Sequence, residues 1–147
     1  MNRLYETDFY AWTVEQSQLL KNRDFQHLDI INLMEEIESL GKQQQQELRN
    51  RLGVLTGHLL KWDYQPQKRS KNWRVTIQIQ RREILDLLED NPSLKSYLEM
   101  AMAKGHRAGL DLVVKETPLN YRDLPPEPIY TLEQLLDPNF PVHLDEY

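Results

Sequence analysis

The stretch from Leu28 to Trp62 carries two successive runs of apolar residues at helical spacing. Asp29 has the residue type of a helix N-cap, and Leu28 before it can pack on Leu33. Gly41 can take the left-handed conformation that often ends a helix. The two apolar rhythms are one residue out of phase, so the stretch predicts a helical hairpin that turns near Gly41. The second run has the spacing of a helix packed lengthwise on its neighbours, and consists of Leu48, Leu52, Leu55, Leu59 and Trp62.

The first helix of this hairpin is predicted to bury one face, formed by Ile30, Leu33, Met34, Ile37 and Leu40. A rise of about 1.5 Å per residue would put Glu36 roughly 8 Å from the turn and Arg51 roughly 14 Å from it. These two side chains lie on facing edges of the hairpin and are predicted to form a structural ion pair. His58, roughly 24 Å from the turn, would lie nearer Asp29 or Asp24.

The remaining elements are also predicted to be helical. Thr7 as an N-cap favours a helix over residues 8–22. Residues 73–80 alternate as a strand would, but Trp73 and Ile77 continue into a longer helical pattern, and a lone strand would have no partner. Asn91 and Pro92 favour a helix that runs to about Glu116, where Gly105 and Gly109 would permit close helix approach.

Together these elements predict an all-α fold, a compact bundle of about five helices, in one domain. Residues 1–117 would form the bundle. Residues 118–147, which are rich in proline, would form a tail docked on it. Thr131 to Gln134 fits a capping box, so this tail should contain one short helix.

Composition limits the class of protein. The 147 residues include no cysteine, which excludes a disulfide framework and a thiol nucleophile. No apolar run is long enough for a membrane span, and the first residues lack an export signal. The expectation is a soluble cytoplasmic protein without membrane contact.

The net charge of −5 conceals an uneven distribution. Residues 61–82 hold seven basic side chains against Asp63 alone, a net of +6, so the rest of the chain carries −11. Interleaved tryptophan and tyrosine make this segment a candidate nucleic-acid surface. The acidic remainder would repel a polyanion and favours an acidic protein partner or a second copy instead. The candidate basic surface consists of Lys68, Arg69, Lys71 and Arg74.

Motifs for chemistry are absent from the sequence. The four histidines never pair at the spacing that places two metal ligands on one helical face, and no nucleophile elbow or phosphate-binding loop occurs. We therefore expect no metal and no cofactor. A carboxylate beside His58 could tune it for acid–base work, but it would serve equally as a structural hydrogen bond.

The ordered motifs of the chain resemble those of the domain of unknown function 29 family of bacterial proteins. The resemblance covers nearly the whole chain and rests on residues 5–12, 28–29, 35–41, 58–62, 65–66, Trp73, Arg82, 92–94 and 130–137. It implies a small all-helical protein without an established role, so it supplies no catalytic residue. The motif positions of the family mark a candidate polar pocket, formed by Asp29, His58, Lys61, Trp73 and Arg82.

The absence of convergent catalytic groups favours a non-catalytic interaction or regulatory module over an enzyme. A second apolar face at Val75 and Ile79 suggests self-association into a homo-oligomer. Two alternatives stay open at this point. One is an enzyme or small-ligand protein with a pocket around His58, and the other is nucleic-acid binding through residues 61–82.

Overall fold

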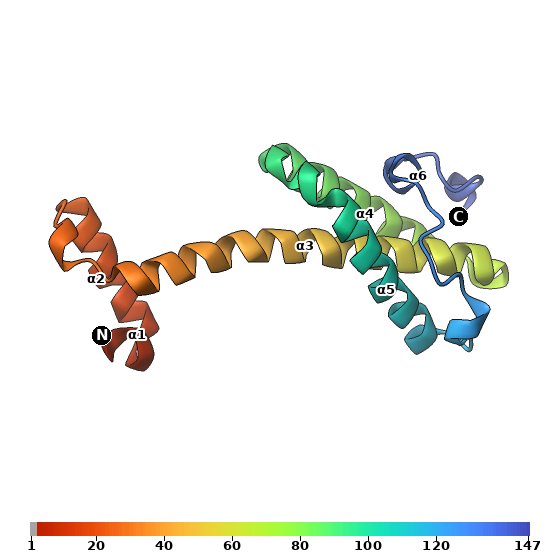
Figure 1. Cartoon of the computed structure of the whole chain (residues 1–147). Coiled ribbons are helices and arrows are strands. Elements are labelled where there is room, and N and C mark those ends of the chain that lie inside the picture. The colour runs from red at the N-terminus through yellow and green to blue at the C-terminus, as the bar shows by residue number, and fades with distance from the viewer. Residues whose placement is uncertain (1–2) are drawn as a thin grey trace. The chain divides into compact units, whose positions relative to one another are not determined.

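The computed structural model describes residues 3–147, and these form helices without any strand. The all-α prediction is therefore confirmed. In chain order the helices are α1 (Arg3–Thr7), α2 (Phe9–Lys21), α3 (Ile30–Tyr64), α4 (Lys71–Asp90), α5 (Leu98–Glu116) and α6 (Leu132–Leu136), joined by short 3₁₀ turns (Figure 1). The contacts divide the chain between Gln43 and Gln44 into an N-terminal unit and a C-terminal unit. This is not the predicted boundary at residue 117, and the docking of residues 118–147 on one bundle stays a prediction.

Helix α3 runs without a break through Gly41, so the predicted hairpin is wrong (Figure 1). No glycine in the described part of the chain has a positive φ, and Gly41 continues the helix. An isolated glycine costs only about 1 kcal/mol in a helix interior. The residues after it are lysine, four glutamines, glutamate, leucine and arginine, which are good helix formers and outweigh that cost.

In the N-terminal unit, α1 and α2 pack through a small aromatic cluster. The Tyr5 ring centroid lies 4.8 Å from that of Trp12 and 5.7 Å from that of Phe9. Asp8, rather than the predicted Thr7, caps α2 by accepting a hydrogen bond from the Ala11 N–H at 3.0 Å. The prediction of a helix near residues 8–22 is otherwise confirmed.

The apolar face predicted to be buried at the start of α3 is exposed. The exposed fractions are 51% for Ile30, 56% for Met34, 65% for Ile37 and 60% for Leu40. Leu33 is half-buried. The prediction failed because it relied on an antiparallel helix after Gly41, and α3 continues in the same direction instead.

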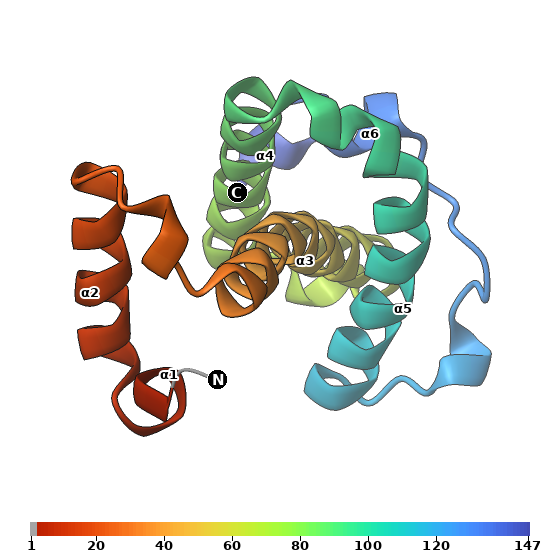
Figure 2. The ribbon, with the colours of Figure 1, turned by 60° about the vertical axis from the view of Figure 1, so that its left-hand side comes forward.

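The C-terminal unit has its core along the second half of α3, where the predicted seam from Leu48 to Trp62 is fully buried. Helices α4 and α5 lie on different sides of this half of α3 (Figure 2). The predicted helix over residues 73–80 is part of α4, in which Ser70 caps the first turn and Ile77 is buried. Of the second apolar face, Val75 is half-buried and Ile79 is 37% exposed.

Helices α3 and α5 approach each other through four glycines. A Cβ added at Gly105 would lie 3.0 Å from Leu52 Cβ, and one at Gly109 would lie 3.0 Å from the backbone nitrogen of Gly57. Side chains of ordinary size would hold the two backbones apart. The expectation that glycines in the fifth helix permit close approach is confirmed.

The last part of the chain belongs to the C-terminal unit. The predicted capping box is present, because Thr131 accepts from the Gln134 N–H and Gln134 accepts from the Thr131 N–H. Helix α6 follows, as predicted. The side chains of this segment that are buried in the core are Leu124, Tyr130, Leu135 and Leu144.

Candidate functional site

An ion pair between a buried lysine and an exposed glutamate lies near the C-terminal end of α3. Lys61 is only 4% exposed, and its Nζ donates to Glu116 Oε1 of α5 at 2.5 Å. The same ammonium lies 5.5 Å from the centroid of the Trp73 ring of α4. The hydrogen bond from Lys61 lowers the pKa of Glu116. This lysine therefore joins α3, α4 and α5 at one point.

His58 lies one turn before Lys61 on α3. Its Nδ1 is 2.8 Å from the Val54 carbonyl oxygen, which can only accept, so Nδ1 carries the proton and Nε2 the lone pair. Burial lowers the pKa of His58, and the positive charge of Lys61 lowers it further. The Val54 bond and the charge of Glu116 oppose this shift without overcoming it. The imidazole is therefore neutral at neutral pH.

The neighbouring turn of α3 binds the end of the chain. The Tyr130 hydroxyl donates to Asp63 Oδ2 at 2.5 Å, and burial raises the pKa of this phenol. The Trp62 ring lies 5.0 Å from the Tyr147 ring, and the Arg69 guanidinium lies 5.1 Å from the Trp62 ring. These contacts hold the C-terminal segment on the helix that carries His58 and Lys61.

The structure brings together three of the five residues of the candidate polar pocket, namely His58, Lys61 and Trp73. Asp29 is not among their partners. Its carboxylate accepts from the indole of Trp12 and from Asn32, both in the N-terminal unit. Arg82 lines a groove of α4 whose other lining residues do not include these three. The convergence of all five residues in one pocket stays a prediction.

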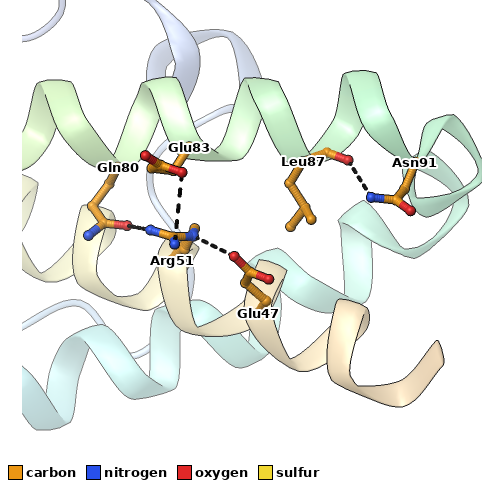
Figure 3. Close-up of polar contacts among 6 residues, drawn as sticks. All are labelled: Glu47, Arg51, Gln80, Glu83, Leu87 and Asn91. Carbon is orange, nitrogen blue, oxygen red and sulfur yellow. Dashed lines mark hydrogen bonds and ion pairs between the residues drawn. The ribbon is translucent and has the colours of Figure 1, made fainter. Parts of the chain in front are cut away.

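The predicted ion pair between Glu36 and Arg51 is wrong. Arg51 bonds Glu47 one turn earlier on α3 and reaches Gln80 and Glu83 of α4 (Figure 3). Glu36 accepts a hydrogen bond from the Tyr5 hydroxyl. The cause is the continuity of α3: fifteen residues of one helix, or about 22 Å, separate Glu36 from Arg51, and no turn brings them together.

The candidate basic surface is partly used inside the fold. Arg69 donates from Nε to the Trp62 carbonyl oxygen at 2.8 Å, and Nε of Arg74 is buried. Lys68 and Lys71 are exposed. Two exposed lysines are a small share of the charge that a phosphate backbone usually meets, so this geometry gives nucleic-acid binding little support.

Three residues that sequence reasoning did not select complete this region, namely Asp63, Glu116 and Tyr130. Glu116 is 55 positions from Lys61 and Tyr130 is 67 positions from Asp63, so no local spacing could connect them. The available signal was weak. A lysine on the apolar side of a seam, directly before the buried Trp62, implies a carboxylate partner without saying which one.

The chemistry open to this region is limited. Within residues 3–147, no hydroxyl or carboxylate hydrogen-bonds to Nε2 of His58, so the nucleophile and base of covalent catalysis are not paired here. The same residues contain no group of three histidine, aspartate or glutamate side chains arranged to hold a metal ion. None of the helices in this range is both long and apolar enough to cross a membrane.

The pH dependence of stability tests this description of His58. The pKa of His58 in the folded chain is below the ordinary value of 6.5. In the pH window between these two pKa values, the unfolded chain binds more protons than the folded chain. The free energy of unfolding therefore falls as pH decreases through this window. We expect His58→Asn, whose amide can still donate to Val54, to lose less stability than the native chain between about pH 7 and about pH 5. Urea denaturation across this range measures the difference. Glu116 titrates below its ordinary value of 4.5, outside the window, so equal losses in the two proteins would contradict the buried neutral imidazole.

Comparison with known proteins gives one result. The family described as Domain of unknown function DUF29 matches residues 4–141 of the chain. No curated protein and no solved structure matches it.

Proposed function

The chain belongs to the DUF29 family, whose description names no activity, and we propose that it is a non-catalytic interaction or regulatory module that pairs with a second copy of itself. The observation that carries this proposal is the exposed apolar stripe of α3, defined as Ile30, Leu33, Met34, Ile37 and Leu40. Four of its five side chains are at least half exposed, over about three turns of helix. Soluble monomers rarely expose contiguous apolar patches of this kind, which usually mark interaction sites.

The spacing within the stripe favours a second helix as its partner. Ile30, Leu33, Ile37 and Leu40 follow one another at intervals of three, four and three residues, the repeat of a coiled-coil seam. Met34 widens this seam on one side. Two identical helices can bury such stripes against each other, because each seam is complementary to itself in a symmetric pair.

The polar residues beside the stripe limit its partners. Glu35 and Glu38 are exposed on the same turns and keep the rest of this helix surface in water. A narrow apolar seam with acidic flanks suits pairing along the helix better than insertion into a lipid surface, which favours basic flanks. The enzyme alternative has less support, since within residues 3–147 neither Asp29 nor Arg82 forms a hydrogen bond or ion pair with His58.

Light scattering coupled to gel filtration, over a concentration series, tests the proposal. We expect the native chain to dimerise, and Ile37→Glu to remain monomeric at the same concentrations with its far-UV circular dichroism unchanged. Gln46→Glu adds the same charge to the opposite, exposed face of α3 and should dimerise like the native chain. A native chain that is monomeric throughout the series would disprove self-association, and a dimer that survives Ile37→Glu would place the interface elsewhere.

A further inference from the structure

Helices α4 and α6 are in contact in the C-terminal unit. A groove lies between α4 and the segment around α6. It encloses about 290 Å³. Its walls include Arg81, Arg82, Leu85, Asp86, Leu136 and Pro138. The volume is near the lower end of the range for small-molecule sites, which suits a compact ligand.

Arg81 carries a buried charge without a carboxylate partner. The residue is 4% exposed, and its guanidinium donates to the backbone carbonyl oxygens of Leu135 at 2.7 Å and Gln134 at 3.0 Å. Its Nη1 is covered and unbonded, and within residues 3–147 no carboxylate lies at ion-pair distance. Desolvation lowers the pKa of Arg81 to about 10, so the group stays charged at neutral pH, while Asp137 acts on it only from a distance. A buried cation of this kind is costly unless an anion compensates it.

Arg82 supplies the accessible donors of the same groove. It is exposed and forms no hydrogen bond or ion pair within the described residues. Asp86, one turn later on α4, also lines the groove but is not bonded to Arg82. Among the side chains that line the groove, two arginines and one aspartate give a net positive charge of one. This balance favours a monoanion over a dianion, because Asp86 would repel the second negative charge.

The other walls are apolar. Leu85 is 47% exposed, Leu136 is half-buried and Pro138 is exposed, so together they offer hydrocarbon surface beside the two arginines. A planar guanidinium matches a carboxylate, which it can bind through two parallel hydrogen bonds. The groove thus combines a monoanion site with a hydrophobic wall.

We propose that this groove binds a small amphipathic carboxylate, with its carboxylate on Arg82 in the field of Arg81 and its hydrocarbon part against Leu85, Leu136 and Pro138. This site is independent of the self-association of α3 and of the His58 region. Nothing in it requires a reaction.

Titration of the full chain with octanoate, followed by amide chemical shifts, tests the proposal. We expect saturable shifts centred on Leu85 and Leu136. Octanamide, which lacks the charge, and acetate, which lacks the chain, should each bind about tenfold more weakly. If octanamide binds as well as octanoate, the arginines have no role in binding and the proposal is wrong.

Three variants sharpen this experiment. Arg82→Gln should weaken octanoate about tenfold, and Asp86→Asn should strengthen it, because the repelling carboxylate is removed. Arg122→Gln removes an exposed arginine that lies outside the groove and should leave octanoate affinity unchanged. An equal loss in Arg122→Gln and Arg82→Gln would show general charge attraction and overturn the site. Groove resonances that shift with protein concentration alone would assign the occupant to a carboxylate of a second copy, which would also overturn it.

Discussion

Gly109→Val is expected to destabilise the C-terminal unit by about 3 kcal/mol. A Cβ at this position would lie 3.0 Å from the backbone nitrogen of Gly57, 3.1 Å from Thr56 Cγ2 and 3.2 Å from the backbone oxygen of Gly53. Two of these three atoms are backbone atoms of α3, which cannot rotate away as a flexible side chain could. The helices must therefore separate, and the contacts of the core between them weaken. Urea denaturation followed by far-UV circular dichroism measures the loss.

Gly41→Ala is the matched control, with the opposite expected sign. A Cβ at Gly41 meets nothing within 4 Å, and the residue lies inside α3 with a helical backbone. Alanine should stabilise the helix there by about 0.5 to 1 kcal/mol. A loss of stability would instead indicate a left-handed turn at Gly41. Unchanged stability of Gly109→Val would contradict the close approach of α3 and α5.

Trp62→Ala is expected to cost about 3 to 5 kcal/mol, the usual range for deleting a large buried aromatic side chain. Trp62 is 1% exposed, and its ring contacts the Tyr147 ring and the Arg69 guanidinium. Its deletion leaves a cavity at the end of α3 and removes a contact that holds the C-terminal residue. Chemical denaturation with native and variant chains compared side by side gives the difference.

Two further variants separate the causes of this loss. Trp62→Phe should cost much less, because it keeps an aromatic ring and removes an indole N–H that is buried without an acceptor. Tyr147→Ala removes the edge contact with Trp62 and keeps the Trp62 side chain, and should cost about 0.5 to 1.5 kcal/mol. A Trp62→Ala loss no larger than that of Tyr147→Ala would contradict the central packing role of Trp62.

Local signals in the sequence identified most of the helices correctly. Pro92 and the Thr131 to Gln134 capping box act within one or two turns, and the structure has a helical turn at each. The seam from Leu48 to Trp62 was predicted correctly, because its members recur at helical spacing on one face of α3 and all of them are buried. Gly41 was misread because a glycine can either end a helix or continue it, and a single-residue signal does not distinguish the two outcomes.

The candidate site was predicted less completely, because several of its contacts join segments that are distant in the sequence. His58 and Lys61 are one turn apart on α3, so helical periodicity alone places them together. Trp73 joins them only through the packing of α4, which places its ring near the Lys61 ammonium. The groove at Arg81 depends on where Gln134 and Leu135 dock, more than 50 positions further along the chain.

By itself, the sequence determined the helical class, the seam of α3 and the close approach that the glycines of α5 permit. These follow from periodicity, side-chain volume and capping, which act over a few residues. The tertiary structure alone decided that Lys61 pairs with Glu116 and that Arg81 binds the carbonyl oxygens of Gln134 and Leu135. These outcomes depend on contacts between distant segments, whose energies no local pattern of residues contains.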